Sequence, residues 1–343
     1  MRIALDAMGG DLAPGETVAG AVLAAKELGV EVALVGDSET MEATLASCGA
    51  RDLPVFVVHA SQVVPMDEHH PVDALRRMRD ASVLVAADLV ARGEASAMVS
   101  AGNTGAAMVA AIMRLKRIRG VDRPAVATVF PTTTGHCLLI DGGANSECRP
   151  HHLLSFAQMA TAYAKSVMRR PRPTVALLSN GEEATKGTEL IIAAHDLLRE
   201  ADLNFIGNIE GKDIPLGRAD VVVTDGFTGN IVLKLAEGVG EAIVFMLKDS
   251  IAKSPIYKIG ALLARPALRA LARRMDYSEY GGALLLGVNG VAVIAHGRSR
   301  AKAIKNAVRA AKAACDANVV ESIAATVAST ARGYEGGNDG AVQ

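Results

Sequence analysis

One stretch of the sequence combines side chains that could bind an anionic ligand. Residues 174–178 are apolar and partly β-branched, which is typical of a strand buried on both faces, and residues 190–198 have the spacing of an amphipathic helix. Between them stand Asn180, Gly181, two glutamates and Lys186. Ligands of open α/β sheets bind beyond the carboxyl ends of the strands, where free N–H groups of the next helix favour anions. The sequence therefore predicts an anion site here, with Lys186 as a mobile positive charge.

Three further stretches, 98–106, 139–145 and 221–230, each end an apolar strand in small residues that include Asn or Asp. They supply the candidate ligand-binding residues Ser100, Gly102, Asn103, Thr104, Asn145, Asp225 and Asn230. Small residues let a ligand approach the backbone closely, and we expect the four turns to face one cleft. The alternative is that Gly, Asn, Ser and Thr only build the turns and the helix N-caps.

The elements that would position these turns alternate between strand and helix along most of the chain. Further strands are expected at 3–6, 31–36, 55–59, 95–100, 125–130, 137–141, 205–209, 219–224 and 288–295. The pair at 125–130 and 137–141 is typical of a hairpin, which gives the sheet an antiparallel element. A long helix from about Ile231 to Ile251 follows the last of the four turns, and His296 follows the final strand. This order indicates an α/β protein with a mostly parallel mixed sheet.

Composition limits the class of protein. Half of the 343 residues are apolar, 33 are glycine and none is tryptophan, which suits an α/β protein with a core of Ala, Val, Leu and Ile. No long Pro/Ser-rich linker divides the chain, so we expect a single α/β unit at 1–335, with room for two lobes, and a flexible tail at 336–343. The net charge of -1 gives no global field that would recruit nucleic acid.

The cysteines and the first residues favour a cytoplasmic protein. The four cysteines show no metal-ligand spacing, so reduced thiols and no metal site are expected. The chain begins with a strand-like segment rather than an export signal, and no uncharged run reaches membrane-spanning length. We therefore expect a protein that is soluble or bound to a membrane surface.

Several common catalytic motifs are missing from the sequence. It has no Gly-x-Gly-x-x-Gly and no Gly-x-Ser-x-Gly, and the order Thr185-Lys186-Gly187-Thr188 does not match a P-loop, so Rossmann, hydrolase and NTPase functions lose support. Cys148 could be a nucleophile, but no histidine is placed to activate it. We expect His151 and His152 to be close in sequence only, and the pair at 69–70 to lie in a solvated loop.

Six motifs, in this order, resemble one known family. They are Asp6-Ala-Met-Gly-Gly-Asp11, Ser100-Ala-Gly-Asn-Thr-Gly105, Asp141-Gly-Gly-Ala-Asn145, Ser179-Asn-Gly-Glu-Glu-Ala-Thr-Lys-Gly187, Thr224-Asp-Gly-Phe-Thr-Gly-Asn230 and Tyr280-Gly-Gly-Ala-Leu-Leu-Leu-Gly-Val-Asn-Gly290. Together they span nearly the whole chain and are similar to the bacterial acyl-acyl-carrier-protein:phosphate acyltransferases. The resemblance implies a three-layer α/β/α fold like the isocitrate/isopropylmalate dehydrogenases and phosphotransacetylases, and a homodimer. It also implies conversion of acyl carrier protein thioester and inorganic phosphate into acyl phosphate for phospholipid synthesis, and no cofactor is expected.

Such a reaction needs little beyond the predicted turns, because phosphate is itself a nucleophile. The site must hold phosphate against the thioester and stabilise the oxyanion, and positioning alone could supply on the order of 7 to 11 kcal/mol without a covalent enzyme intermediate. We assign Lys186 to phosphate or the oxyanion, Asn230 with Asn180 to hydrogen-bond donation, and Asp225 to orienting one of these groups. The predicted substrate-binding set is completed by Gly181, Ser100, Gly102, Asn103, Thr104, Asn145 and His296.

Two other functions stay open at this point. An oxidative decarboxylase of the same fold would use a nicotinamide cofactor and a divalent metal, for which Asp141 and Asp225 are available as ligands. A membrane-associated scaffold would bind acyl carrier protein without turnover.

A basic amphipathic excursion, a helical hairpin, is expected at about 248–280. Residues 250–275 contain no acidic side chain and six basic ones, Lys253, Lys258, Arg265, Arg269, Arg273 and Arg274. On a helix from Ala267 to Met275, Leu268 and Leu271 share one stripe that the arginines flank or oppose, which is the pattern of an interfacial helix. We expect contact with an anionic membrane surface; the alternative is packing in a dimer or docking of the acidic carrier protein.

Overall fold

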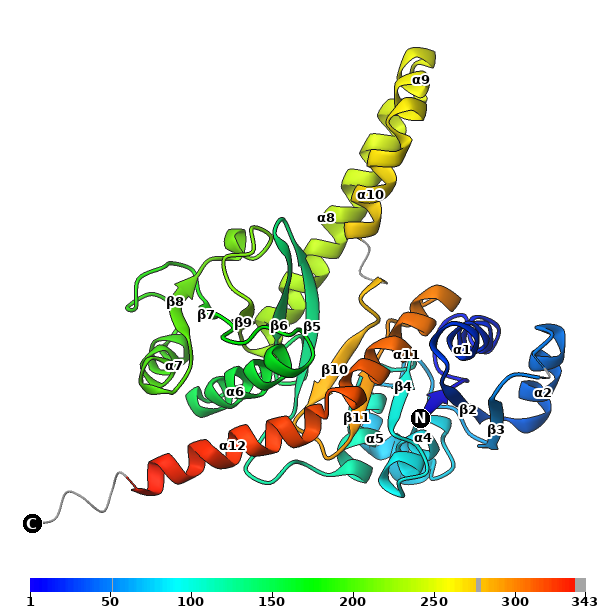
Figure 1. The fold of residues 1–343 in the computed structure, drawn as a ribbon, viewed down its shortest axis with the longest axis horizontal. Helices are drawn as coiled ribbons and strands as arrows, with labels where there is room; N and C mark the ends of the chain where they lie inside the picture. The colour runs from blue at the N-terminus through cyan, green and yellow to red at the C-terminus, as the bar shows by residue number, and fades with distance from the viewer. Residues whose placement is uncertain (51, 276–278, 337–343) are drawn as a thin grey trace, which may run out of the picture.

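The computed structural model describes residues 1–50, 52–275 and 279–336 (Figure 1). Its strands form one eleven-stranded sheet in the order β3-β2-β1-β4-β11-β10-β5-β6-β9-β7-β8. The strands are β1 Arg2–Asp6, β2 Glu31–Gly36, β3 Val55–His59, β4 Ala97–Ser100, β5 Ala125–Thr132, β6 Gly135–Ile140, β7 Val175–Leu178, β8 Phe205–Ile209, β9 Val221–Val223, β10 Ala283–Leu286 and β11 Val291–Ile294.

Helices connect most of these strands. They are α1 Gly15–Leu28, α2 Ser38–Ser47, α3 Pro71–Arg77, α4 Ser82–Ala91, α5 Thr104–Leu115, α6 Pro150–Ser166, α7 Glu189–Glu200, α8 Gly226–Ala252, α9 Pro255–Leu263, α10 Arg265–Met275, α11 Ala301–Asp316 and α12 Val319–Gly336, with a short 3₁₀ turn at Gly211–Asp213. The mixed α/β class and the mostly parallel sheet expected from the sequence are confirmed.

Alternating side chains along each strand bury apolar residues on both faces of the sheet. In β6, Leu138 and Ile140 face a core that includes α6, whereas Leu139 faces a core against α8. Helices α1, α2, α6, α7, α11 and α12 cover the first face of the sheet. Helices α3, α4 and α5 cover one half of the second face, and α8 begins on the other half. The chain is therefore layered as helices, sheet and helices.

The sheet contains two parallel blocks that run in opposite directions. Strands β3, β2, β1, β4 and β11 are parallel to one another, as are β6, β9, β7 and β8. Antiparallel pairing of β11 with β10, β10 with β5 and β5 with β6 joins the blocks. The turns after β6, β7 and β9 consequently leave the sheet at one edge, and the turn after β4 leaves at the other. Our expectation that four turns face one cleft is corrected to three turns in a row, with the 98–106 turn elsewhere.

The hairpin agrees with the expectation, and other elements differ from it in their bounds. The predicted hairpin is confirmed, because β5 and β6 pair antiparallel from Ala127 with Ile140 to Thr132 with Gly135. The final strand was expected at 288–295 but is shorter, and the preceding strand β10 was missed. The long helix begins at Gly226 rather than near Ile231, since the carboxylate of Asp225 caps it.

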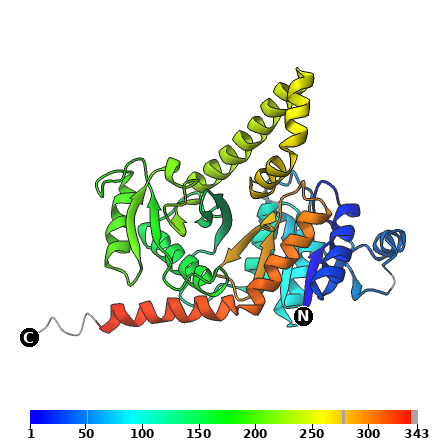
Figure 2. The same cartoon turned by 45° about the horizontal axis from the view of Figure 1, so that its top comes forward.

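Helices α8, α9 and α10 form an arm that projects from the rest of the molecule (Figure 1, Figure 2). Helix α8 alone has 27 residues and is about 40 Å long. In both views the chain turns at the tip of the arm, and α10 runs back toward the rest of the molecule. The arm exposes many large apolar side chains, including Leu235, Val239, Ile243, Phe245, Met246, Ile256, Ile259, Leu262, Leu263 and Leu271. The side chains of Arg273 and Arg274 lie outside the described residues, as do residues 337–343 of the expected tail.

Candidate active site

The turn after β6 is shaped by one fully buried carboxylate. Oδ1 of Asp141 accepts hydrogen bonds from the backbone N–H groups of Val126, Gly143 and Ala144 at 2.9 to 3.1 Å. Oδ2 accepts from the backbone and the side-chain amide of Asn145 at 2.8 and 2.7 Å. Burial raises the pKa of Asp141, while these donors act in the opposite direction. Asp141 therefore fixes the shape of the turn, and Asn145, whose amide also donates to Pro124 O, is held with it.

The start of α8 packs directly on that turn because two of its residues are glycines. A Cβ at Gly226 would lie 2.7 Å from the Asn145 nitrogen, and one at Gly229 would lie 1.9 Å from the carbonyl oxygen of Asp141. The Gly226 N–H donates to Asn145 O at 2.8 Å. Only residues without a side chain let the helix approach this closely.

Asp225 and Asn230 are positioned by this contact. Asp225 is half-buried, and its carboxylate accepts hydrogen bonds from the backbone N–H and the hydroxyl of Thr228 at 2.9 and 2.8 Å. Asn230, in the first turns of α8, is exposed and lies beside Gly143. Asn230 is therefore exposed next to the Asp141 turn, on the helix whose N-terminus Asp225 caps.

Lys186 belongs to the neighbouring turn, after β7, at the same edge of the sheet. Its N–H donates to Glu183 O at 3.0 Å, and the hydroxyl of Ser179 donates to its carbonyl oxygen at 3.2 Å. The stem of Lys186 covers Gly181, where a Cβ would lie 2.8 Å from the lysine Cγ. The side chains of Lys186 and Asn180 are exposed, and within the described residues Lys186 takes part in no ion pair. Its ammonium group is thus available to an anion.

A side chain from β8 holds this second turn. The Nδ2 group of Asn208 donates to the carbonyl oxygen of Glu183 at 3.0 Å, the same oxygen that accepts from Lys186 N–H. Asn208 is buried, and sequence reasoning did not select it because it lies inside a strand rather than in a turn.

The predicted residues after β4 serve the opposite edge of the sheet. Ser100 is fully buried, donates to Asp6 at 2.7 Å and accepts from Gly102 N–H at 3.1 Å. Asn103 caps α5 through Ala106 N–H, and its amide donates to the carbonyl oxygens of residues 66 and 68. The polar atoms of Ser100 and Asn103 are therefore engaged in holding the backbone.

Thr104 and His296 are the exposed members of this second group. His296 follows β11, and its Nδ1 accepts the N–H of Arg298 at 3.3 Å. The next residue, Gly297, accepts a hydrogen bond from Asp11 N–H at 2.8 Å, which places this turn beside the one after β1. The structure thus gathers the predicted residues into two groups rather than one.

Cys148 lies close to the Asp141 turn, with its sulfur 3.6 Å from Asn145 O. Burial raises the pKa of the Cys148 thiol to about 11, and the carboxylates of Asp141 and Asp225 contribute to the shift. A thiol with this pKa is protonated at neutral pH and is a poor nucleophile.

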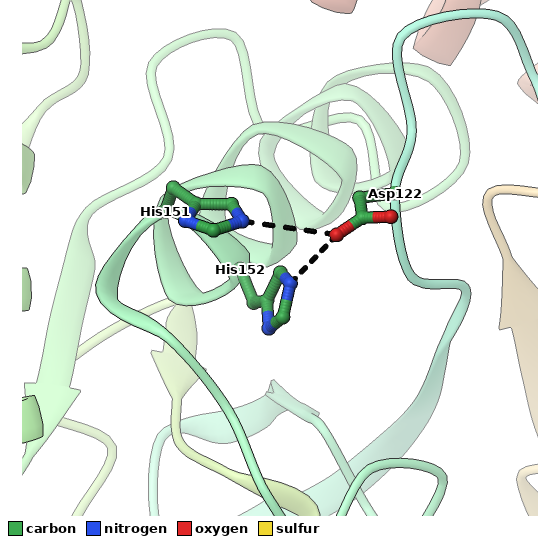
Figure 3. Close-up of side chains that lie close together, drawn as sticks. All are labelled: Asp122, His151 and His152. Carbon is green, nitrogen blue, oxygen red and sulfur yellow. Dashed lines mark hydrogen bonds and ion pairs between the residues drawn. The ribbon is translucent and has the colours of Figure 1, made fainter.

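Figure 3 shows Asp122, His151 and His152 close together. Nε2 of His152 lies 2.8 Å from Oδ2 of Asp122, and Nε2 of His151 lies 3.7 Å from the same oxygen. The expectation that the two histidines are neighbours in sequence only is wrong, because both reach the loop that precedes β5. The antiparallel pairing of β5 with β6 brings the loop before β5 next to the start of α6, which follows β6.

The hydrogen bonds of His152 do not suit a metal ligand. Nδ1 of His152 accepts the N–H of Arg149 at 3.0 Å, so in the neutral ring Nε2 carries the proton and donates it to Asp122. A metal-bound histidine has the reverse arrangement, in which the second nitrogen donates. The bond from His152 lowers the pKa of Asp122 and ties the loop before β5 to α6.

Comparisons with known proteins identify the family. A family model described as fatty acid synthesis protein matches residues 1–322. A curated relative from Heliobacterium modesticaldum, called phosphate acyltransferase, is 55% identical to this chain over 94% of it and 96% of its own length. The chain belongs to the phosphate acyltransferase family. It is therefore an acyltransferase enzyme.

Solved structures show how widely the fold of this acyltransferase is shared. A phosphotransacetylase from Streptococcus pyogenes superposes with a TM-score of 0.62 at 18% identity, covering 92% of this chain and 94% of that one. A 4-hydroxythreonine-4-phosphate dehydrogenase from Klebsiella pneumoniae gives a TM-score of 0.50 at 13% identity, covering 92% and 99%. At such identities the likeness shows the fold alone, because one fold can carry different chemistry. Family membership, not fold, separates this chain from the dehydrogenases.

Proposed function

We propose that the protein transfers an acyl group from acyl carrier protein to inorganic phosphate, giving acyl phosphate and free carrier protein for phospholipid synthesis. The observation that carries the proposal is the 55% identity, over nearly the full length, with a relative called phosphate acyltransferase. The turns at the carboxyl ends of β6, β7 and β9 supply a cation and amides at one edge of the sheet, as an anionic co-substrate requires.

The proposed reaction is a direct displacement. A phosphate oxygen attacks the thioester carbonyl carbon, the carbonyl oxygen becomes the tetrahedral oxyanion, and the carbon–sulfur bond then breaks to release the carrier thiolate. An ordinary thiol has a pKa of about 8.5, so its thiolate is a tolerable leaving group. The raised pKa of Cys148 supports a mechanism in which the enzyme forms no acyl intermediate on that thiol.

The proposed roles of the side chains follow from their exposure. Lys186 binds phosphate or the oxyanion, and Asn230 with Asn180 donates hydrogen bonds, since all three are exposed at this edge of the sheet. Asp225 orients Asn230 by capping α8. Gly181 lies under the stem of Lys186 in the same turn. Asn145 belongs to the same site because it holds the turn after β6. The other members of the proposed substrate-binding set, Ser100, Gly102, Asn103, Thr104 and His296, lie at the other edge of the sheet, so their proposed role is separate from phosphate binding.

One assay tests the function. Purified protein is incubated with a long-chain acyl carrier protein thioester, and release of the free carrier thiol is followed with and without inorganic phosphate. Thiol release that requires phosphate and yields acyl phosphate supports the proposal. Acyl coenzyme A assayed in parallel shows which carrier is used. Binding of the acylated carrier without phosphate-dependent release would favour a scaffold instead.

The fold type and the oligomeric state are part of the same proposal. We propose that the fold is of the isocitrate/isopropylmalate dehydrogenase type and that the active protein is a homodimer, as the family resemblance implies.

The arm formed by α8 to α10 would be the basic helical hairpin excursion. Its exposed apolar residues and the cations Lys253, Lys258, Arg265 and Arg269 support contact with an anionic membrane surface.

In the part of the chain that the structure describes, no helix combines the length and the apolar character needed to cross a membrane.

A further inference from the structure

The segment between α5 and β5 carries a local excess of positive charge. Residues 114–123 contain five basic side chains and one acidic side chain, although the whole chain has a net charge of -1. Two of these cations are paired with aspartates. The other three, Lys116, Arg119 and Arg123, are exposed and form no ion pair within the described residues.

One more exposed arginine adjoins this segment. The hydrogen bond from His152 to Asp122 ties the start of α6 to the segment, and Arg149 stands at the N-cap of α6. Arg149 is exposed and likewise has no ion pair in the described part of the chain. We call the four side chains Lys116, Arg119, Arg123 and Arg149 the basic surface.

The basic surface borders the candidate active site. The amide of Asn145, in the turn after β6, donates to the carbonyl oxygen of Pro124 at 2.8 Å, directly after Arg123. The thiol of Cys148 is close enough to Arg123 and to Asp225, the cap of α8, for both charges to affect its pKa. A molecule seated on the basic surface would therefore lie next to the start of α8.

We infer that the basic surface docks the acidic face of an acyl carrier protein. The inference rests on the proposed function and adds the place where the carrier protein binds. Charge complementarity favours an acidic partner. A carrier protein that presents its acyl group on a flexible prosthetic group must dock beside the reacting groups. The exposed apolar residues of the arm lie on different helices, so carrier docking and membrane contact would use separate surfaces.

Charge reversal on the basic surface tests the inference. The variant carries Arg119→Glu with Arg123→Glu, and neither residue belongs to the proposed catalytic set. The control carries Lys165→Glu with Arg172→Glu, which makes the same change of charge at exposed positions. Lys165 lies about 21 Å from His151 along α6, so the control leaves the basic surface intact.

Two substrates separate docking from chemistry. We expect the variant to raise KM at least about tenfold for acyl carrier protein thioester, because like charges then face the carrier. For acyl-pantetheine, a neutral thioester without the protein, kcat and KM should match wild type. An equal loss on both substrates, an unchanged KM for the carrier substrate, or the same rise in the control would each overturn the inference.

A binding measurement keeps docking distinct from turnover. A fluorescently labelled holo acyl carrier protein is titrated with wild type, variant and control at low salt, and the anisotropy is recorded. Selective loss of binding in the variant supports docking. If no acyl transfer to phosphate were found, that result would refute the proposed function but not the docking of the carrier protein. If the variant instead bound the carrier normally and lost binding to anionic vesicles, the surface would belong to the membrane and the inference would fail.

Discussion

Lys186 and Asn230 combine exposure with positions fixed by backbone contacts, which is what a preorganised site requires. We predict that Lys186→Ala and Asn230→Ala each lower kcat by roughly 10²- to 10³-fold, since loss of one oxyanion donor costs about 2.7 to 4 kcal/mol. Melting temperature and oligomeric state should not change, because neither side chain is buried. The exposed Lys165→Ala is the matched control. Near-normal turnover in either variant would remove that residue from the proposed site.

A substitution of Cys148 tests whether phosphate attacks the thioester directly. Its thiol has a pKa raised to about 11 by burial, and the proposed phosphate attack does not use it. We therefore predict that Cys148→Ser keeps near wild-type kcat and KM. The check is the phosphate-dependent assay combined with mass spectrometry of the protein quenched during turnover. An acyl group trapped on Cys148 would contradict direct attack.

The start of α8 is the element on which the site depends. A methyl group at position 229 would lie 1.9 Å from the carbonyl oxygen of Asp141, so Gly229→Ala must push the helix away from the turn after β6. We predict a loss of about 1 to 3 kcal/mol in stability, as for other overpacked sites. Turnover should fall as well, because Asn230 moves with the helix.

Gly238 provides the control on the same helix. A Cβ there meets no neighbouring atom within 4 Å, and alanine favours helix over glycine by roughly 1 kcal/mol. Gly238→Ala should therefore be neutral or stabilising, with normal turnover. Thermal unfolding and kcat of the two variants decide the point, and equal behaviour of both would show that the close packing at Gly229 is unimportant.

The sequence predicts which strands and helices exist better than it predicts the residues at which they begin and end. The hairpin of β5 and β6 is visible in the sequence because both strands are apolar and a Pro-Thr-Thr-Thr-Gly run separates them. The first turn of α8 was missed because two glycines in five residues suggest a turn, and only the tertiary contact with Asp141 shows why they stand in a helix. The turn-shaping role of Asp141 could have been predicted, because the sequence shows an aspartate followed by two glycines at the end of a strand.

At the scale of the whole molecule, the direction of strands decides which turns can cooperate. The turn after β4 contains small and polar residues, as do those after β6, β7 and β9, yet it leaves the sheet at the other edge. Three antiparallel pairings cause this. Two of them, β5 with β6 and β10 with β11, join neighbouring strands of the chain, but the third pairs Leu284 of β10 with Ala127 of β5, and no local pattern predicts a contact between such distant residues. The candidate residues Ser100, Asn103 and His296 are consequently separated from Lys186 and Asn230 by sheet topology.

The projecting arm gives the last prediction, which concerns where the enzyme works. Leu271 of α10 is 54% exposed and Leu268 is half-buried, and the exposed Arg265 and Arg269 stand on the same helix. We predict that the wild type sediments with vesicles of anionic lipid and is released by salt, because each basic residue near the surface contributes about 1 kcal/mol of attraction. Leu268→Glu with Leu271→Glu should abolish the binding, since it removes apolar contact and adds repulsive charge.

A matched double variant shows whether the arm itself is responsible. Phe56→Glu with Ile206→Glu places the same charges at exposed apolar positions on β3 and β8, the two outermost strands of the sheet, and it should bind vesicles like wild type. Activity with acyl carrier protein in solution should be normal in both variants if the arm serves only the membrane. Wild type that fails to sediment with anionic vesicles at low salt, together with a loss of carrier-dependent turnover in the arm variant, would assign the arm to carrier docking. The membrane interpretation would then be wrong.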